Sequence, residues 1–291
     1  MDEIINHGVI VDQRDTDWIA GVNTQIVYEV RNPSGDWRPF LPPGEKQVTD
    51  NYQTDFLDCV TRSLQNAIET QEKFLTGNQY DYSDRWTAKR SGTTKQGNYL
   101  YKVADQVRYD GLVLESEYPD IATGTWEEQY ADIPEPLNTQ LIANGQKWKE
   151  KWDFKYEFIP LNKQAMLDHI KQAPLQLVIP GHAVVGFLCE QDIVDYFDSY
   201  SPFEKKVQYG TLQSVLKPLL TLKRINPMYE KVVKKDGKTF GVRISTPDGD
   251  QIIYSTGEEK WRSWNKSDSY GLNTVNQDGT SNFLDCTPLP W

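Results

Sequence analysis

The chain has 291 residues, of which 38% are hydrophobic, enough for one large core with or without a small second unit. Its 42 acidic and 31 basic residues give a net charge of -11, which disfavours nucleic acid and anionic membranes as partners. No apolar run approaches the roughly 20 residues that cross a bilayer, and the first residues lack a cationic, apolar leader, so we expect neither a transmembrane segment nor a signal peptide.

Residues 1–50 hold two short runs of β-type residues, at 8–13 and 24–31, and then a proline-rich stretch at 38–46. Such a sequence favours extended structure over helix. We predict an N-terminal extended or β segment, residues 1–50, that packs on the core.

A buried helix is predicted from Asp58 onward, because apolar residues recur there at three- and four-residue steps. They are Val60, Leu64, Ala67, Ile68, Phe74 and Leu75. Asp58 is the N-cap candidate, so Cys59 falls in the first turn, where free amide groups and the positive helix end favour a thiolate. A lone cysteine on an apolar face is more commonly a small core residue, so both interpretations stay open.

Two further helices are predicted before the sequence changes character. One follows the GNY at 97–99 and stops at Gly111, and the other covers 137–152, with a break expected near Gly145 because of an interior Asn-Gly. After Phe158, a short helix precedes Pro174.

Three compact apolar runs follow, at 175–179, 182–188 and 193–200, and are typical of neighbouring strands. Residues 228–291 contain Asp-Gly turns at 236 and 248, which predict a β-hairpin or small meander. The order of helices first and strands afterwards favours an α+β fold over a doubly wound sheet.

Four residues form a candidate nucleophilic site. Gln53 lies six residues before Cys59, where its amide would stabilise an oxyanion beside the Cys59 N–H. His182 opens an apolar strand directly after Gly181, and Asp198 lies where it would orient a histidine base. Asp198 is equally well explained as a turn residue at a strand end. His7 and His169 lack such a setting, and we expect them to be structural or solvated.

The cysteine count argues against other kinds of site. Cys59, Cys189 and Cys286 are widely spaced and form no CxxC pair, so neither a disulfide framework nor a zinc site is indicated. The Asp-Gly turns lack the acidic spacing of a calcium loop. We expect no metal and no cofactor.

In this order and spacing, the four residues resemble the site of papain-like cysteine proteases. That family has a glutamine six residues before the cysteine of its central helix, then a histidine opening a strand, then an Asn-Ser-aromatic triplet. Here Gln53, Cys59, His182 and the Asp-Ser-Tyr triplet at 198–200 stand in those positions. The GNY at 97–99, the segment DGLVLESEYPD at 110–120 and the GDWRPFLPP at 35–43 are also similar to the family, so the resemblance covers about residues 35–210.

The resemblance implies a helical left lobe and an antiparallel β right lobe, built from residues 51–227, with residues 228–291 as a small β appendage. It implies that Cys59 attacks a peptide carbonyl, with His182 as proton carrier and Asp198 orienting it. Gly97 and Asn98 correspond to the family's glycine pair, whose backbone binds extended substrate, and Gly181 and Tyr200 complete the substrate-binding candidates.

The sequence also departs from the family. Asp198 replaces the usual asparagine, Asp58 places a like charge beside the nucleophile, and Val60 replaces an aromatic residue. Phe56 replaces a disulfide cysteine, which fits a reducing compartment. Only Pro180 and Gly181 separate two strands that a long loop usually joins. About 50 residues precede Gln53, too few for the family's usual inhibitory propeptide, so we expect no control by zymogen processing.

We therefore predict a cysteine-type peptidase acting on a peptide or protein. The alternatives are a weak or inactive papain-like protein with a structural or binding role, and an amidase or peptidoglycan endopeptidase using the same triad. Residues 83–99 most resemble papain-like proteins of phages and environmental bacteria, which implies a cytoplasmic or virion-associated location. The C-terminal appendage is a candidate attachment site for an assembly partner.

Overall fold

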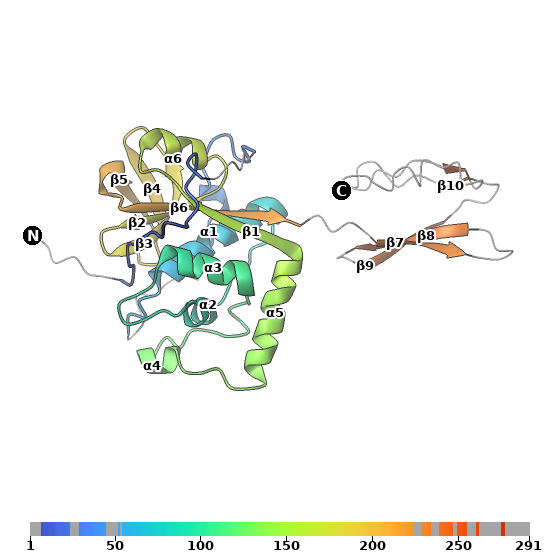
Figure 1. Ribbon diagram of the computed structural model, residues 1–291, viewed down its shortest axis with the longest axis horizontal. Coiled ribbons are helices and arrows are strands. Elements are labelled where there is room, and N and C mark those ends of the chain that lie inside the picture. Colours follow the sequence, from blue (N-terminus) through green and yellow to red (C-terminus); the bar gives the residue numbers. More distant parts are fainter. Residues whose placement is uncertain are drawn as a thin grey trace, which may run out of the picture. The chain divides into compact units, whose positions relative to one another are not determined.

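A computed structural model describes residues 7–23, 29–44, 52 and 54–223, and, further on, 228–233, 239–246, 249–254, 260–261 and 275–276. Contacts between Cα atoms divide the chain into two units, Met1–Leu222 and Lys223–Trp291. Cys59, His182 and Asp198 belong to the first unit, whose helices and strands are labelled in Figure 1.

The first unit begins with helices and continues with strands, as the α+β prediction requires. Its helices are α1 (Cys59–Thr76), α2 (Asp84–Ser91), α3 (Leu100–Asp110), α4 (Trp126–Gln129), α5 (Leu137–Lys151) and α6 (Lys163–His169), with a short 3-10 helix at Arg38–Phe40. Its strands are β1 (Trp152–Phe158), β2 (Leu175–Ile179), β3 (His182–Cys189), β4 (Ile193–Phe197), β5 (Glu204–Gln208) and β6 (Ser214–Leu222), with a second 3-10 turn at Tyr209–Thr211.

The six strands form one antiparallel sheet in the order β1-β6-β2-β3-β4-β5. The three apolar runs predicted as neighbouring strands are β2, β3 and β4, and this prediction is confirmed. Figure 1 shows α2, α3, α4 and α5 gathered on one side of α1, and β2 to β5 on the other. The α+β, papain-like expectation of a helical part and a β-rich part therefore holds.

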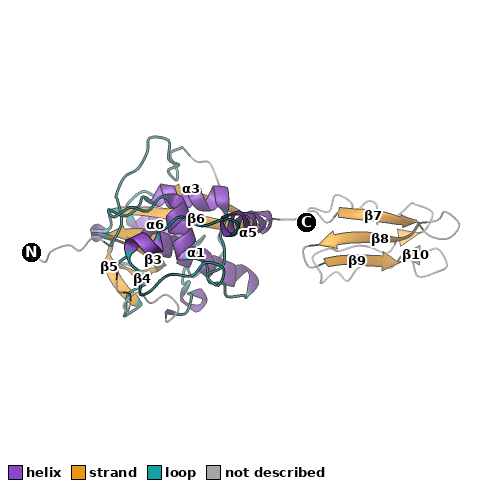
Figure 2. Cartoon of the chain, turned by 90° about the horizontal axis from the view of Figure 1, so that it is seen from below, coloured by secondary structure: helices purple, strands orange, loops and turns teal. Residues whose placement is uncertain are grey.

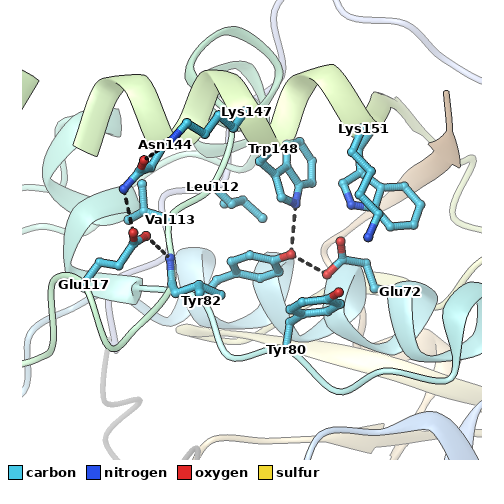
Figure 3. Close-up of a pocket in the computed structure, with 12 residues that line it drawn as sticks. Glu72, Tyr80, Tyr82, Leu112, Val113, Glu117, Asn144, Lys147, Trp148 and Lys151 are labelled. Carbon is cyan, nitrogen blue, oxygen red and sulfur yellow. Dashed lines mark hydrogen bonds between the residues drawn. The ribbon is translucent and has the colours of Figure 1, made fainter. Parts of the chain in front are cut away.

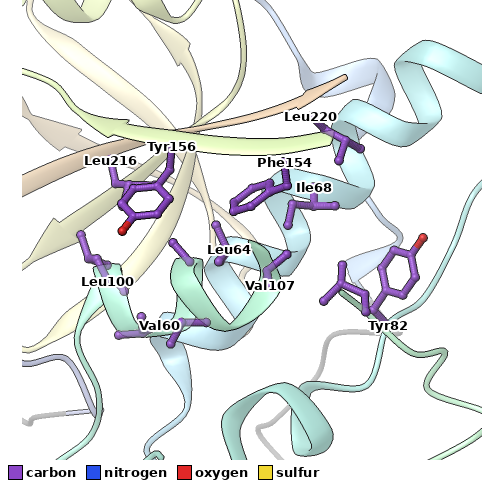
Figure 4. Packing of buried hydrophobic residues seen from close by; sticks show 14 of the residues in the cluster. Val60, Leu64, Ile68, Tyr82, Leu100, Val107, Phe154, Tyr156, Leu216 and Leu220 are labelled. Carbon is purple, nitrogen blue, oxygen red and sulfur yellow. The ribbon is translucent and has the colours of Figure 1, made fainter. Parts of the chain in front are cut away.

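Helix α1 is the central element, because every residue from Cys59 to Glu72 is buried. Its apolar face, with Val60, Leu64 and Ile68, packs against α3 and against strands β1 and β6 (Figure 4). Burying a side chain of this size stabilises the fold by about 1.5–3 kcal/mol. Gln176 Nε2 on β2 donates to the Val60 carbonyl at 2.8 Å, which ties the first turn of α1 to the sheet.

The predicted helix ends are mostly confirmed. Helix α3 starts directly after Tyr99 and ends at Gly111. The break expected near Gly145 was wrong, since α5 runs unbroken from Leu137 to Lys151. A Cβ atom on Gly145 would lie 2.3 Å from the Asp110 carbonyl oxygen, so this glycine allows the end of α3 to approach α5 closely.

The N-terminal part of the chain forms little regular structure where it is described. The run at 8–13 makes only one isolated parallel bridge, between Val9 and Asn98, and most of the run at 24–31 lies outside the described residues. Trp37, in the DWR sequence, is fully buried, and its Nε1 donates to the Ile170 carbonyl at 2.6 Å. This indole anchors the proline-rich stretch on the β-rich part.

The second unit contains β7 (Met228–Val233), β8 (Thr239–Thr246) and β9 (Gly249–Tyr254), which pair antiparallel in that order (Figure 2). Two short strands, β10 (Lys260–Trp261) and β11 (Val275–Asn276), form a separate pair. The β character expected for residues 228–291 is present, while the turns at 236 and 248 fall outside the described residues. The boundaries 1–50, 51–227 and 228–291 stay predictions.

Candidate active site

Cys59 is the first residue of α1, as the sequence predicted, and only 3% of it is exposed. Ala183, the residue after His182, is buried in the same hydrophobic cluster as Cys59, and its backbone N–H lowers the pKa of the thiol. The start of α1 and the start of β3 therefore lie in one buried cluster. At a helix start the backbone N–H groups have no partner within the helix, and they are aimed at any negative charge formed there.

His182 and Asp198 are directly hydrogen-bonded, with Nε2 of the histidine 2.8 Å from Oδ1 of the aspartate. The pairing of β3 with β4 brings this about, because His182 opens β3 and Asp198 follows the last residue of β4. Among the described residues, the other ring nitrogen, Nδ1, is buried and has no hydrogen-bond partner. One nitrogen is thus held by a carboxylate, and the other is open to exchange a proton.

Asp198 has a second partner that the sequence analysis missed. Lys205 Nζ on β5 lies 2.9 Å from Asp198 Oδ2, while the Tyr200 N–H donates to Oδ1 at 3.2 Å. Although burial opposes ionisation, the hydrogen bond and charge of His182, followed by those of Lys205, lower the pKa of Asp198. The residue that orients His182 is therefore a carboxylate held ionised. Lys205 lies in a short strand, β5, and nothing in the local sequence indicates that this lysine binds Asp198.

The environment of Cys59 opposes a thiolate in this conformation. Burial raises the pKa of its thiol well above the usual range, and the carboxylates of Asp58, Asp55 and Asp198 raise it further, while the Ala183 N–H lowers it. The sulfur is thus held as a neutral thiol while it is covered. Exposure of the site to water would remove the effect of burial, which is the largest of those that raise the pKa of Cys59.

Asp58 precedes Cys59 at the N-cap position, but its side chain makes no cap hydrogen bond. Instead it forms a two-point ion pair with Arg62 one turn later, at 2.9 Å and 3.1 Å. Arg62 is buried and also contacts Asp84 at 2.9 Å and Asp120 at 2.5 Å. Burial, opposed by Arg62, raises the pKa of Asp58. This network, which the sequence did not predict, directs the Asp58 carboxylate toward Arg62.

The N-terminal segment, residues 7–10, lies across this site. The His7 N–H donates to the Gly181 carbonyl at 2.8 Å, the Asn98 N–H donates to the Gly8 carbonyl at 2.8 Å, and the Ile10 N–H donates to the Asn98 carbonyl at 2.9 Å. The His7 ring lies 5.0 Å from the rings of both His182 and Tyr200. The expectation that His7 is merely structural or solvated missed this contact.

The predicted substrate-binding residues are thus bound by the chain itself. Asn98 and Gly181 form backbone hydrogen bonds to the N-terminal segment, Gly97 packs against Gly8, and Tyr200 contacts His7. Gln53, the predicted oxyanion donor, lies outside the described residues, so its role stays a prediction.

A cavity of about 240 Å³ adjoins the site and is lined by His7, Tyr52, Thr54, Asp55, Phe56, Asp58 and Tyr200. Another, of about 340 Å³, lies between the C-terminal part of α1 and α5 and contains none of the candidate catalytic residues. Its walls combine aromatic, aliphatic and charged side chains, and Tyr82 donates to Glu72 while accepting from Trp148 (Figure 3).

No described helix has the length and apolar character needed to cross a membrane. No protein-family model and no curated protein matches the sequence. Solved structures do match the fold. Xylellain, a cysteine protease from Xylella fastidiosa, is 14% identical, with a TM-score of 0.56 over 76% of this chain and 98% of that one. Digestive procathepsin L 3 of Tenebrio molitor larval midgut is 14% identical, with a TM-score of 0.50 over 74% and 77% of the two chains. The chain therefore has the fold of the papain-like cysteine proteases.

Proposed function

We propose that this chain is a cysteine peptidase that hydrolyses peptide bonds with Cys59, His182 and Asp198. One observation carries the proposal: a buried histidine is bonded to a carboxylate through Nε2, its Nδ1 has no hydrogen-bond partner among the described residues, and the next residue, Ala183, is buried in the same cluster as Cys59. A core cysteine would need none of these arrangements. The papain-like fold supports the same assignment.

In the proposed reaction, Cys59 gives its proton to His182 Nδ1 and its sulfur attacks the carbonyl carbon of the peptide bond. The oxyanion accepts a hydrogen bond from the Cys59 N–H, and from Gln53 if it takes its predicted role. His182 then protonates the leaving amine as the C–N bond breaks, leaving a thioester on Cys59. A water molecule gives a proton to His182 and attacks the thioester, the C–S bond breaks, and the thiol and a carboxylic acid product result.

Asp198 accepts the Nε2–H throughout, which fixes the ring and stabilises the imidazolium form. Lys205 in turn holds the second oxygen of Asp198. The hydrogen bond between Tyr200 N–H and Asp198 adds a third constraint on that carboxylate. The base is therefore fixed by groups on β5 and in the connection between β4 and β5.

A structural or binding protein is the second candidate, and a specific observation favours it: the site is occupied by residues 7–10 and Cys59 is buried. An occupied site blocks substrate in either case. The two candidates differ in whether Cys59 reacts once a peptide or probe gains access.

The decisive experiment is prolonged incubation of the full chain with a diverse peptide library, followed by mass spectrometry of the products. We expect cleavage by the parent chain and none by Cys59→Ala. Cys189→Ala is the matched control, because Cys189 is also a buried free thiol on β3, and burial raises its pKa to about 12. Cleavage that persists in Cys59→Ala, or no cleavage by the parent under any condition, would reject the peptidase.

A further inference from the structure

The cavity of about 340 Å³ between α1 and α5 has the size of a small-molecule site, and the proposed reaction does not use it. Pockets that bind small molecules begin at roughly 300 Å³, so this cavity fits a small ligand or a single side chain. Its lining combines the buried Leu112 and Trp148 with the exposed Leu114 and Lys147. The cavity can therefore be reached from solvent.

The two ends of the cavity differ in how their carboxylates are bonded. Figure 3 shows Glu117 and Asn144 at one end and Glu72 at the other. Asn144 Nδ2 donates to Glu117 Oε1 at 2.6 Å, and the Leu114 N–H donates to Glu117 Oε2 at 3.0 Å. Glu72 is fully buried, yet its Oε1 has no hydrogen-bond partner among the described residues. A polar group of a ligand therefore has a bond to gain at the Glu72 end.

The missing partner of Glu72 Oε1 is a hydrogen-bond donor. The other oxygen, Oε2, accepts from the Tyr82 hydroxyl at 2.5 Å, and Tyr82 accepts from Trp148 Nε1 at 3.0 Å. These two bonds fix the carboxyl group and leave no proton of Tyr82 for Oε1. Buried polar atoms of folded proteins are almost always bonded, and a carboxylate bonds most strongly to a positively charged donor.

Two aromatic rings beside Glu72 already hold a cation. Lys151 Nζ lies 5.4 Å from the centre of the Tyr80 ring and 5.3 Å from the centre of the Trp152 ring. At such distances the face of an aromatic ring attracts an ammonium group. Burial raises the pKa of Glu72 to about 7, and the charge of Lys151 opposes this rise. The lysine of the chain itself thus marks a place where an ammonium group is stable.

We propose that this cavity is a second binding site, which takes a primary alkylammonium group, as carried by a lysine side chain or by a free diamine. The ammonium group displaces that of Lys151 from the rings of Tyr80 and Trp152. It donates to Glu72 Oε1, while the alkyl chain packs on Leu112. A quaternary ammonium has the charge without an N–H, and an alcohol has a donor without the charge, so neither meets both requirements. The site is independent of the proposed peptidase activity.

The first test compares ligands on the full chain at pH 9, above the pKa of Glu72 and below that of an alkylammonium. The indole N–H resonances of Trp148 and Trp152, assigned with Trp148→Phe and Trp152→Phe, report binding by NMR. Pentylamine should shift them to saturation, and pentyltrimethylammonium and pentanol should bind about tenfold or more weakly than pentylamine. No saturable shift, or equal affinity for the three ligands, would overturn the proposal. Cadaverine and Nα-acetyl-lysine methylamide carry the same ammonium group, and the tighter of the two identifies its source.

The second test changes the carboxylate. Glu72→Gln keeps an acceptor for Tyr82 and removes the charge, so pentylamine should bind about tenfold or more weakly than to the parent. Glu69→Gln is the matched control, because Glu69 is also buried on α1 with an unpartnered oxygen but does not line the cavity, and it should leave the affinity unchanged. Equal affinities of the parent and folded Glu72→Gln would contradict the proposed contact. If Glu72→Gln does not fold, the comparison of ligands on the parent decides.

The third test removes the resident cation. Lys151→Met should bind pentylamine severalfold more tightly than the parent, because the ligand no longer displaces a lysine. Lys147→Met is the matched control, since Lys147 also lines the cavity from α5, but its Nζ lies 3.2 Å from Asn144 Oδ1. If the amine were attracted only by the net charge of the cavity, the two variants would gain equally. Equal gains, or weaker binding by Lys151→Met, would overturn the displacement of Lys151.

Discussion

Asp198 offers the sharpest test of the proposed mechanism, because two substitutions separate its hydrogen bond from its charge. Asp198→Ala and Asp198→Asn both remove the carboxylate, and with it the Lys205 ion pair and the effect of this charge on the Cys59 thiol. Only asparagine keeps an oxygen that accepts the Nε2–H of His182. The ratio of the two variants therefore measures what an oxygen acceptor contributes at the position of Asp198 Oδ1, which lies 2.8 Å from Nε2.

A hydrogen bond to a charged group contributes about 1.5–3 kcal/mol when it is buried. At about 1.4 kcal/mol for each factor of ten, we expect Asp198→Ala to react roughly 10- to 150-fold more slowly than Asp198→Asn. Because asparagine keeps an oxygen acceptor for the Nε2–H, we expect Asp198→Asn to stay within about tenfold of the parent.

The assay is the second-order rate of Cys59 modification by an epoxide probe, with circular dichroism to confirm folding. Asp195→Ala is the matched control, because Asp195 is also a buried carboxylate on β4 with two cationic partners, Arg38 at 3.0 Å and Lys206 at 3.1 Å. It should lose stability without losing the reactivity of Cys59. Equal rates for folded Asp198→Ala and Asp198→Asn would refute the role of Asp198 as the residue that orients His182.

The remaining predictions concern buried charges. Burial raises the pKa of Glu72 to about 7 from 4.5, so the folded chain binds more protons than the unfolded one in this window and its unfolding free energy falls as pH rises through 7. Glu72→Gln should reduce the difference in unfolding free energy between pH 4.5 and pH 8 by up to roughly 3 kcal/mol, as measured by urea titration. The same difference in Glu72→Gln and in the parent would contradict this prediction. The side chains of Lys217 and Glu157 form an ion pair and are 1% and 2% exposed, so Lys217→Met should lower the unfolding free energy by about 3–5 kcal/mol. The double variant with Glu157→Gln should lose less than the sum of the two single losses, because the two side chains are coupled. Additive losses in urea titrations would exclude this coupling. Arg62→Gln leaves three buried carboxylates without their cation, so its cost of about 3–5 kcal/mol at pH 7 should shrink near pH 4 as they protonate, and an equal cost at both pH values would count against this network.

Local patterns explain how much of the fold the sequence predicted. The three- and four-residue spacing after Asp58 fixed α1 and placed Cys59 in its first turn, and the apolar runs around His182 fixed β2 to β4. The break near Gly145 was wrong for a reason that no local pattern contains. That glycine serves a contact with another helix, and a helix tolerates glycine where a neighbour requires it.

Some features of the candidate site also follow from local sequence, and others follow only from the tertiary structure. The sequence by itself determined which residue begins the central helix and which residues stand at the strand ends, because period and turn chemistry act over a few residues. Only the tertiary structure decided that Arg62 also binds Asp84 and Asp120, that Lys205 holds Asp198, and that His7 to Ile10 lie on the predicted substrate-binding residues. These contacts join side chains and backbone groups that no local period brings together, so packing of the whole unit sets them.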